Sequence, residues 1–588
     1  MTSATQAPRL RPHGALRAAL HLLALPLLTL LPAREAAAAW PADPNVNVPL
    51  CLAAGTSQVT SVVSDMRGGA IAVWYDDRSA NFDVFARRVD SGGVARWGTD
   101  GVQAAVVAGT SAQILPKAVS DGAGGAIVVW IDNRTTSNML YAQRVDSSGT
   151  RLWGNGGVQV ATAPNNNGVT TFDIAADGAG GVAVAWAAQI GLSTDIFAQC
   201  LGSNGALKWT TAGRTLCSNL ADQTRPTVLR KASGTFVVAW EDTRSGFRTD
   251  LYGQALNGTG TALWAANGLL LAGSAQNAIN PLLLATGTDD CIMVWDADSL
   301  GVGDVRSQRL GTTGAAQWPT AGLRVFPAGV SGLSGITSDG NGGAFALVSS
   351  PNPSTGKLTL WINRIAFNGN MMVGTTGARV SSHGSNQISA VLAADGGTGC
   401  VVAWFDDVAS DGSTFQLYAQ RVAPNGSTRW AASGIPVCLQ ADQVPSVGMV
   451  TASANRDVVL AWSDTRASAA ADVYAQGVDS TGALGAQNVA VGPGPAPTAT
   501  ALARPSPNPA PRGVTTLSYA LSAREHVRLQ VIDPAGRVVS VLEDGMREAG
   551  QHQVAWDGRS DGRTLPPGLY LVHLRTSTRN EIRRLVLL

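Results

Sequence analysis

The sequence has little histidine, little glutamate and little charge. Of its six histidines, His383 alone lies between residues 40 and 491, and Glu241 is the one glutamate in that interval. A histidine-based triad or a multi-histidine zinc site is therefore hard to assemble there. The chain has 42 basic and 41 acidic residues, and charged residues make up 14% of it. This balance leaves no net field for nucleic acid or an anionic membrane, so we expect neither partner.

Long apolar runs are also missing, apart from one near the N-terminus. Arg9 and Arg17 precede the stretch AALHLLALPLLTLLPA, and the small residues 36–39 offer a cleavage site before Trp40. A charged start, a short apolar run and a small-residue end are typical of a secretory signal peptide, which we assign to residues 1–39. No later stretch reaches the ~18 apolar residues that a spanning helix needs, so the exported mature chain is expected to have no membrane span.

The chain contains instead a unit of about 55 residues that is repeated eight times between Trp40 and about Val491. Each unit has an apolar run that ends in tryptophan, with Val348 or Ser349 in its place in the sixth unit. These tryptophans are Trp74, Trp130, Trp186, Trp240, Trp295, Trp404 and Trp462. A second series keeps the same spacing at Trp97, Trp153, Trp209, Trp264, Trp318 and Trp430. The repetition predicts an array in which each unit buries its face against its neighbours.

Each unit predicts four short strands. In the second unit, turn residues separate four segments rich in β-branched and aromatic residues. Four strands in about 55 residues, joined by turns too short for helices, favour a β-propeller over a solenoid. The N-terminal text WPADPNVNVPLCLAAGTSQ is similar to the late-repeat text WAASGIPVCLQADQ, so we expect it to supply the outer strand of the last blade and close the ring. The predicted fold is an all-β, eight-bladed β-propeller over residues 40–491.

The six cysteines do not predict a disulfide framework. They are Cys51, Cys200, Cys217, Cys291, Cys400 and Cys438. Three of them share one repeat position, and two others stand four residues before a repeated tryptophan. Equivalent positions in different blades are usually too far apart to bridge, so buried free thiols are favoured. Cys200 with Cys217 is the one plausible pair.

Asp and Arg recur just after the first tryptophan of several units. The Asp residues two positions on are Asp76, Asp132, Asp242, Asp406 and Asp464, and the Arg residues four positions on are Arg78, Arg134, Arg244 and Arg466. Another Asp begins the next strand at Asp83, Asp195, Asp250, Asp304 and Asp472. In units 1, 4 and 8 we expect the Arg to face this second Asp across the mouth of the hairpin as a structural turn clamp. Repetition favours structure, because a catalytic group is needed once whereas a turn clamp is needed in each blade.

Departures from the repeat provide the candidate ligand residues. The loops between second and third strands and between successive units should emerge on one face, because strand direction alternates. On that face, Asp296 and Asp298 depart from the consensus, as does the loop DDVASDGSTF with Asp406, Asp407 and Asp411. Carboxylates close together in a Gly/Ser loop can hold calcium, but the full spacing of a calcium loop is missing and a solvated turn is favoured. Calcium is the one cofactor that the sequence leaves open.

The C-terminal text differs from the repeats. Residues 492–513 are rich in proline and predict an extended linker. From residue 514 to 588, the alternating segments TTLSYAL, VRLQVID, QHQVAW and LYLVHL predict a small antiparallel, Ig-like β-sandwich.

Motifs in this module resemble a known family. They begin at Pro507-Asn508-Pro509 and continue through Asp533, Gly536, Arg537, His552, Trp556, Asp557, Gly558, Arg559, Pro567, Gly568 and Tyr570. Together they resemble the Ig-like C-terminal sorting tails of type IX-secreted bacterial proteins and the Ig-like domain of flagellar hook-cap proteins. The resemblance implies that the tail engages outer-membrane secretion machinery and directs the chain to the surface or medium of a Gram-negative-type bacterium. The same module also occurs as a structural Ig-like domain. The repeats are similar to the DIYAQR repeats of exported bacterial proteins, which implies a fold and a setting but no catalytic residue.

Two functions stay open on this basis. The first is a secreted or cell-surface module that binds a glycan or another surface protein, or has a structural role. The second is a carbohydrate-active hydrolase or lyase in which Asp residues of the loop face supply two carboxylates. The sequence assigns no catalytic residue, because it does not show which of the many turn aspartates converge.

Overall fold

The protein is all-β in a computed structural model, which contains no helix in the ranges it describes. None of these residues therefore forms a helix long and apolar enough to cross a membrane. The predicted signal peptide lies outside the described residues. The described residues are 40–107, 111–135, 137–162, 165–273, 276–299, 302–330, 332–352, 354–412, 414–440, 446–451, 457–466, 470–485, 500–502, 505, 508, 510, 515–522, 525–547, 550–560, 563–577 and 579–587.

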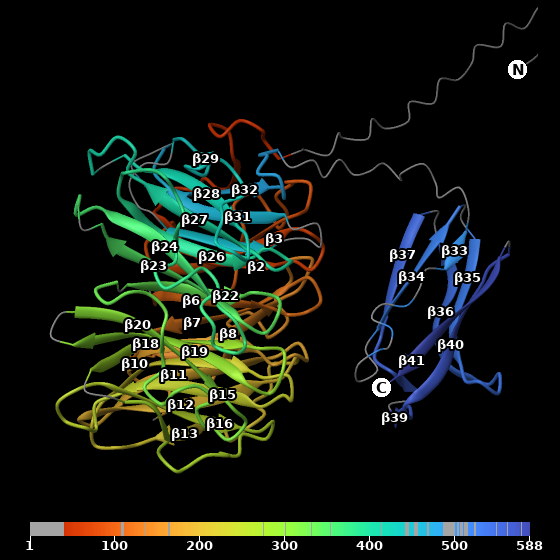
Figure 1. Cartoon of the computed structure of the whole chain (residues 1–588), viewed down its shortest axis with the longest axis horizontal. Coiled ribbons are helices and arrows are strands. Elements are labelled where there is room, and N and C mark those ends of the chain that lie inside the picture. Colours follow the sequence, from red (N-terminus) through yellow and green to blue (C-terminus); the bar gives the residue numbers. More distant parts are fainter. Residues whose placement is uncertain are drawn as a thin grey trace, which may run out of the picture. The chain divides into compact units, whose positions relative to one another are not determined.

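Eight four-stranded antiparallel sheets follow one another along the repeats (Figure 1). The first strands are β2 (Ser57–Ser64), β6 (Gln113–Ser120), β10 (Val169–Ala176), β14 (Gln223–Arg230), β18 (Asn277–Ala285), β22 (Leu333–Ser338), β26 (Gln387–Ala394) and β30 (Ser446–Thr451). The second strands are β3 (Ala70–Asp76), β7 (Ala126–Asp132), β11 (Val182–Ile190), β15 (Phe236–Asp242), β19 (Cys291–Ser299), β23 (Ala344–Pro351), β27 (Cys400–Asp406) and β31 (Val458–Asp464). The third strands are β4 (Asp83–Val89), β8 (Met139–Val145), β12 (Ser193–Leu201), β16 (Asp250–Leu256), β20 (Val302–Leu310), β24 (Leu358–Ile365), β28 (Gln416–Val422) and β32 (Asp472–Val478). The fourth strands are β5 (Val102–Gln103), β9 (Val158–Gln159), β13 (Arg214–Cys217), β17 (Leu269–Ala272), β21 (Leu323–Arg324), β25 (Ala378–Arg379), β29 (Ile435–Cys438) and, in the last sheet, β1 (Val48–Cys51).

The N-terminal strand β1 belongs to the sheet of the last repeat. It pairs antiparallel with β32, with Val48 opposite Ala475. Consecutive first strands contact one another along the whole series, and β30 in turn contacts β2. The first and last sheets are therefore neighbours, as their red and blue strands show in Figure 1.

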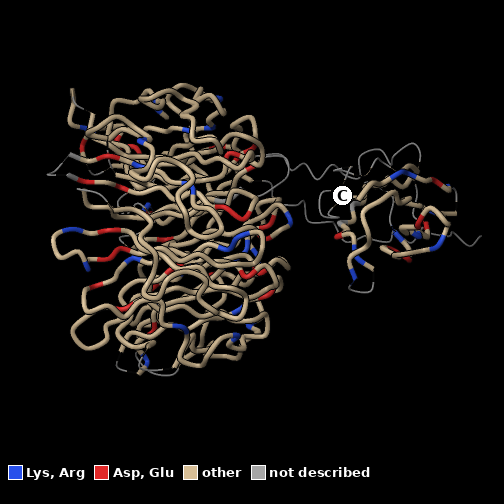
Figure 2. Tube along the Cα trace, turned by 60° about the horizontal axis from the view of Figure 1, so that its bottom comes forward, with Lys and Arg blue, Asp and Glu red and all other residues tan. Residues whose placement is uncertain are grey.

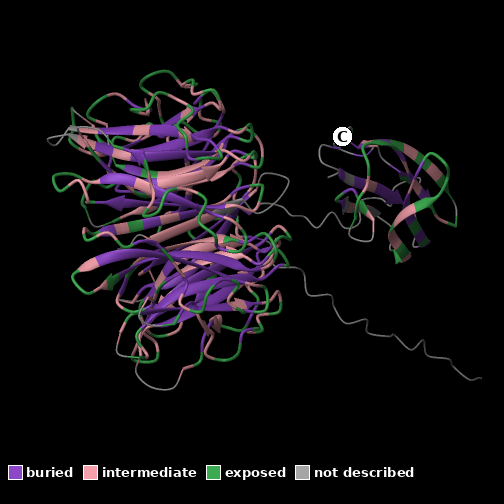
Figure 3. Cartoon of the chain, turned by 90° about the horizontal axis from the view of Figure 1, so that it is seen from below, coloured by how far each residue is buried: buried purple, intermediate pink, exposed green. Residues whose placement is uncertain are grey.

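The hydrophobic core lies between neighbouring sheets rather than in one centre. One buried cluster joins strands of the second repeat to strands of the third, and another joins β1, β31 and β32 to β2 and β3. Six of the seven repeated tryptophans are fully buried on second strands. Figure 3 shows much of these sheets in purple, the colour of buried residues. Charged residues of both signs are interspersed along the trace in Figure 2, in keeping with the nearly neutral composition.

Tryptophans of the second series, except Trp318, each donate a hydrogen bond to the next sheet. The indole Nε1 of Trp97 donates to the carbonyl of Ser147 at 3.1 Å, and that of Trp153 to Ser203 at 3.1 Å. Trp40 makes the same bond from the last sheet to the first, because its Nε1 donates to the carbonyl of Ser91 at 3.0 Å. Its ring also packs against Gly93, where an added Cβ would lie 2.9 Å from the indole and φ is +82°. Only glycine is readily accommodated there.

All six cysteines are buried free thiols, including Cys200 and Cys217, as the sequence favours. Burial raises the pKa of Cys200 to about 12 and that of Cys291 to about 11. These groups stay protonated at neutral pH, so they are poor nucleophiles.

The C-terminal residues form a two-sheet sandwich. One sheet has the order β33 (Ala501–Leu502), β34 (Thr515–Leu521), β37 (Gly550–Trp556), and the other has the order β36 (Val538–Arg547), β35 (Glu525–Ile532), β40 (Gly568–Arg575), β41 (Asn580–Leu587). The two-residue strands β38 (Arg559–Ser560) and β39 (Arg563–Thr564) pair with each other. A core that includes Tyr519 and Trp556 fills the space between the two main sheets. Strand β33 lies within residues 492–513, so part of the segment expected to be a linker pairs with the sandwich.

Candidate functional site

The predicted Asp–Arg clamp exists, but its partners differ from those expected. Arg78 Nη2 lies 2.6 Å from Asp76 Oδ2, and the Nε of Arg78 donates to Asp76 Oδ1 at 2.8 Å. The pair therefore joins residues two apart and does not cross the hairpin to Asp83. Arg244 pairs with Asp242 and Arg466 with Asp464 in the same way. The expectation of a bond across the hairpin is wrong because the turn after each second strand bends the Arg back over its own strand end.

The second Asp of each hairpin has other partners. Asp83 accepts a hydrogen bond from the hydroxyl of Ser79, and Asp250 pairs with Arg248 at 2.9 Å. Asp472 lies beside Asp464, and burial together with that neighbouring carboxylate raises the pKa of Asp472.

Each complete clamp is a buried network of four side chains. In the second repeat, Trp130 Nε1 donates to Asp132 Oδ2 at 2.9 Å. The guanidinium of Arg134 lies 3.7 Å from the ring centre of Tyr141, and its Nη1 donates to the carbonyl of Gly156 at 3.0 Å. The indole and the guanidinium of this network have partners inside the repeat, so a structural role explains it without a ligand.

The seventh repeat has no Arg in its clamp. Asp406 instead accepts hydrogen bonds from Trp404, from the Ser385 hydroxyl and from His383 Nδ1, which lies 3.0 Å away. The His383 ring packs edge-on against Tyr418, with ring centres 5.0 Å apart. The one histidine of the repeats thus takes the place of the missing guanidinium.

The five candidate aspartates are not brought together. Asp296 accepts from Asn280 Nδ2 at 3.1 Å and from the amide of Leu333, whereas Asp407 caps its own loop by accepting from the amide of Asp411 at 3.0 Å. Asp298 stands opposite Asn277 near the end of β19, and Asp406 belongs to the His383 cluster. Among the residues that the structure describes, no three His, Cys, Asp or Glu side chains gather as a metal site would require.

The motif residues of the C-terminal module lie in turns and in its core. Asp533 pairs with Arg537 across a turn at 2.8 Å, and Asp557 accepts from the amide of Arg559 at 3.1 Å. Trp556 is buried and donates to the carbonyl of Arg559 at 3.0 Å. His552 stacks on Tyr519, and Tyr570 donates to the carbonyl of Pro566. The positive φ angles of Gly536 and Gly558 suit their turns, and Pro567 and Gly568 lead into β40.

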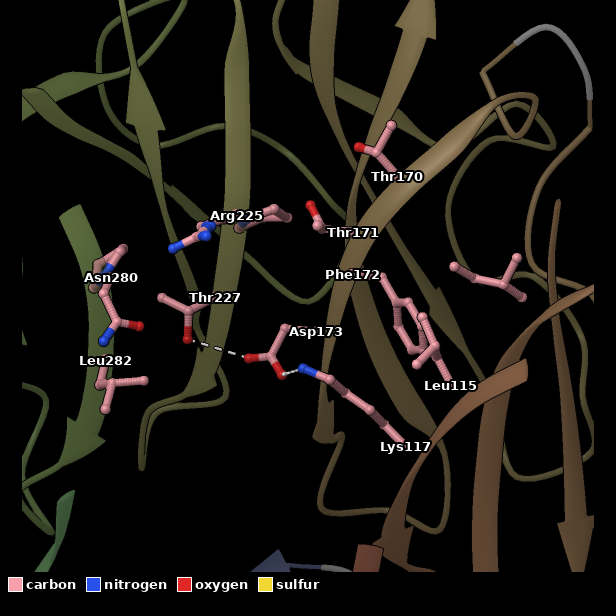
Figure 4. A pocket seen from close by; sticks show the side chains of 13 residues that line it. Leu115, Lys117, Thr170, Thr171, Phe172, Asp173, Arg225, Thr227, Asn280 and Leu282 are labelled. Carbon is pink, nitrogen blue, oxygen red and sulfur yellow. Dashed lines mark hydrogen bonds and ion pairs between the residues drawn. The ribbon is translucent and has the colours of Figure 1, made fainter. Parts of the chain in front are cut away.

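A cavity of about 410 Å³ lies along four consecutive first strands, β6, β10, β14 and β18, from near their starts to their middles (Figure 4). It is lined by Leu115, Lys117, Ile131, Thr170, Thr171, Phe172, Asp173, Arg225, Pro226, Thr227, Asn280, Pro281 and Leu282. Volumes of about 300–1,000 Å³ with apolar walls and a few polar groups are usual for small-molecule sites. The first strands begin at the face of the loops between second and third strands, because their starts pair with the ends of the second strands.

The backbone of these strands is bulged at the cavity. The register of β14 against β15 shifts between Thr224 and Thr227, and β6 and β18 shift at the equivalent place. At the bulges the non-glycine residues Leu115, Arg225 and Asn280 have φ of 52°, 47° and 54°. Left-handed φ costs about 1–3 kcal/mol at such residues. Ser389 at the equivalent bulge of β26, outside the cavity, has φ of 50°, so this bulge belongs to the repeat. Bulges of this kind also redirect a side chain next to a site.

A polar bridge crosses three repeats inside the cavity. Lys117 Nζ on β6 lies 2.8 Å from Asp173 Oδ1 on β10. The other oxygen of Asp173 accepts from the Thr227 hydroxyl at 3.1 Å and from the amide of Val228 at 3.0 Å on β14. Figure 4 shows Lys117 and Thr227 converging on Asp173 from either side. Asp173 therefore serves as a link between strands.

Exposed apolar tips border the same face. Leu192, Leu220 and Phe247 are almost fully exposed. They stand in the β11–β12 hairpin, the β13–β14 connection and the β15–β16 hairpin, all of which belong to the two central repeats of the cavity. Large exposed apolar side chains that gather on one face are typical of interaction surfaces.

Sequence reasoning missed this site, although a signal was present. Prolines recur at Pro116, Pro226 and Pro281, each directly after a residue with left-handed φ. Proline within a strand indicates an edge strand or a bulge. The emphasis on aspartates directed attention to the loops instead.

Comparison with known proteins extends this description. Residues 512–580 match the FlgD Ig-like domain family model. Among solved structures, the chain is similar to the GH93 α-L-arabinofuranosidase of Fusarium graminearum at 12% identity and a TM-score of 0.32, covering 62% of this chain and 91% of that one. It is also similar to a PL25 ulvan lyase at 10% identity and a TM-score of 0.39, covering 66% and 99%. An endo-arabinase from Bacteroides thetaiotaomicron gives 10% identity and a TM-score of 0.27, covering 44% and 90%. No curated protein matches the sequence. Likeness at this level gives no basis for transferring an activity.

Proposed function

We propose that the eight repeat sheets are the blades of one closed β-propeller. The cyclic contacts of the first strands support this arrangement, since β30 contacts β2 as β2 contacts β6. The pairing of β1 with β32 and the bond from Trp40 to Ser91 join the two ends of the repeat region. Closure of this kind leaves no long free sheet edge.

This propeller binds a small polar ligand, of the saccharide class, in the cavity at β6, β10, β14 and β18. The observation that carries the proposal is that non-repeating polar side chains from neighbouring repeats meet at one cavity. Lys117 and Asp173 each pair with the residue just before the repeated tryptophan of the second strand. In other repeats the residue at this position is small or apolar, as at Ser61, Gly335 and Val391. Because structure is repeated and function is not, the departures mark the site.

Binding fits the cavity better than hydrolysis or lyase chemistry. Asp173 is the one carboxylate among its lining residues, and its oxygens already accept from Lys117, Thr227 and Val228. Hydrolysis of a glycosidic bond normally uses two carboxylates on either side of the bond.

In this proposal the N-terminal and C-terminal segments direct export of the protein. Residues 1–39 form the signal peptide, residues 40–491 the propeller and residues 514–588 a tail that engages outer-membrane secretion machinery. Of the expected linker 492–513, strand β33 belongs to this tail. The match to an Ig-like family model and the two-sheet sandwich support the nature of the tail. The protein then acts at the cell surface or in the medium. A fusion of residues 500–588 to a periplasmic reporter tests this step, and retention of the fusion in the periplasm of a type IX-competent host would refute the sorting role.

The function itself is tested on the purified full-length mature chain with a glycan array and parallel assays of sugar release. We expect binding without release, and loss of binding when the bridge is removed by Asp173→Ala. Sugar release that Asp173→Ala abolishes would replace binding with an enzyme activity. Binding that survives this change would move the site elsewhere.

A further inference from the structure

Arg225 is the charged residue of the cavity with the weakest ion pair. Lys117 and Asp173 neutralise each other, so Arg225 is the remaining charge among the lining residues. Its side chain is 62% exposed, and its nearest carboxylate is Glu241, whose Oε1 lies 3.8 Å from Nη1. At that separation the contact is an ion pair without a normal hydrogen bond.

Glu241 is itself held by other groups. Its Oε1 accepts from the amide of Asn280 at 2.8 Å, and its Oε2 accepts from the Thr224 hydroxyl at 3.4 Å. The carboxylate is nearly buried, with its side chain 10% exposed. Glu241 therefore holds the bulges of β14 and β18 together, and most guanidinium donors of Arg225 remain available to the cavity.

The backbone fixes the direction of this side chain. Arg225 has φ of 47° and precedes Pro226, whose ring restricts the next step of the chain. In a regular strand, side chains point alternately to the two faces of the sheet, and the bulge at Arg225 interrupts this alternation. Its side chain is thereby directed into the cavity, where Figure 4 shows it between Thr171 and Asn280.

The cavity favours a saccharide over an added peptide strand. A peptide that pairs with a sheet edge needs backbone N–H groups along that edge. Pro116, Pro226 and Pro281 remove such donors from three of the four strands. The cavity offers hydroxyl and amide groups instead, including the buried Thr171 Oγ1, which has no hydrogen-bond partner in the described structure.

We infer that the ligand is an acidic saccharide whose carboxylate is bound by the guanidinium of Arg225. A planar guanidinium binds a carboxylate through two parallel N–H···O bonds, which a lysine does not reproduce. The hydroxyls of Thr170 and Thr171 lie on the neighbouring strand to bind the sugar hydroxyls. This inference rests on the proposed binding function and names its ligand class.

The test uses the full-length mature chain and a panel of oligogalacturonate, alginate and hyaluronan oligosaccharides. Each probe is paired with its counterpart in which the carboxyl groups are reduced to alcohols, and affinities are measured by calorimetry. We expect at least one acidic probe to bind, and its reduced counterpart to bind about 10- to 100-fold more weakly, as loss of a charged hydrogen-bonded pair implies. Binding should also weaken as salt is raised, because the contact is ionic.

Variants at Arg225 separate binding from folding. Arg225→Gln and Arg225→Lys should lose about 10-fold or more in affinity for the acidic probe. The matched control Arg324→Gln alters a half-exposed guanidinium on the outer strand β21, which pairs with Asp304 of β20. This variant should bind the acidic probe as the unaltered chain does. Arg225→Gly should lose binding while its thermal unfolding midpoint stays equal or rises, because glycine adopts left-handed φ without strain.

The possible outcomes distinguish the two proposals. Equal affinity for acidic and reduced probes would overturn the inference and leave the binding function standing. Absence of binding to every saccharide would overturn the binding function and the inference with it. Acidic binding that Arg225→Gln leaves unchanged would overturn the assignment to this residue.

Discussion

The ends of the second strands and the starts of the first strands lie on the same face, yet they are built in opposite ways. At the second-strand ends, the Trp–Asp–Arg clamp recurs with nearly constant geometry, and its buried donors have partners within the repeat. At the first-strand starts, the residues differ from repeat to repeat, the backbone is bulged and a buried hydroxyl lacks a partner. The difference teaches that polar groups without a structural partner gather where the side chains depart from the repeat, although the bulge itself is repeated.

The clamp should give the largest loss of stability when one partner is removed. Asp464 is fully buried, and the Arg466 side chain is 10% exposed. Asp464→Ala leaves this guanidinium buried without its anion, and we expect a loss of about 3–5 kcal/mol in the free energy of unfolding. The control Arg96→Ala removes a pair in which this arginine is 52% exposed and leaves the turn bonds of Asp90 in place, and we expect no more than about 1 kcal/mol from it. Chemical denaturation measures both, and equal losses would show that the clamp is not structural.

Asp395, in the turn between β26 and β27, should make the stability of the protein depend on pH in the acid range. Burial alone would raise the pKa of Asp395, but hydrogen bonds from Arg421 and from the amides of Gly397 and Gly399 lower that pKa below its ordinary value. The stability gained from Asp395 is therefore present above the unfolded-state pKa of ~3.9 and is lost as pH falls through the lower folded-state pKa.

We expect Asp395→Asn to reduce the unfolding midpoint at pH 7, though less than Asp464→Ala because the amide still accepts a hydrogen bond. The difference from the unaltered chain should shrink as pH falls below about 4. Denaturation curves between pH 7 and pH 2 measure this convergence. A difference that stays constant with pH would contradict the role of the charge.

The sequence predicts the framework well because the framework repeats. The spacing of Trp130 and its equivalents predicts the repeat, the turn residues within a repeat predict four strands, and the sheets have four. The sequence predicts the positions of Asp76 and Arg78 but not their mutual bond, because the fold of the turn between β3 and β4 decides which carboxylate the arginine reaches. Equivalent cysteines were correctly predicted to be free.

The cavity could not be predicted in the same way. Its residues Lys117, Asp173 and Thr227 are 56 and 54 residues apart, and they meet because strand register and bulges place them at one level. Register depends on the pairing of whole strands, which the identity of one residue does not determine. Pro226 marks a bulge in the sequence, but the direction of Arg225 follows from its φ angle, which only the three-dimensional structure provides.

The second series of tryptophans allows a smaller effect to be measured within the framework. Trp153 Nε1 donates to Ser203, whereas the buried Nε1 of Trp318 has no partner in the described structure. Replacement of either indole by phenylalanine removes a similar volume, but only Trp153→Phe breaks a hydrogen bond. We expect it to cost about 1 kcal/mol more than Trp318→Phe in the free energy of unfolding. Equal losses would mean that the bonds between sheets add nothing to packing.

The smallest change in stability should come from the cavity itself. Thr171 Oγ1 is buried without a partner, so Thr171→Val removes an unsatisfied hydroxyl and should leave the free energy of unfolding unchanged or raise it by up to about 1 kcal/mol. The matched change Thr227→Val removes a hydroxyl that donates to Asp173, and we expect a loss of about 1 kcal/mol. Saccharide binding should weaken in both variants, so Thr171→Val should lose function without losing stability, whereas Thr227→Val should lose both. If Thr171→Val destabilises the chain as much as Thr227→Val does, the cavity belongs to the framework and the contrast between the two regions fails.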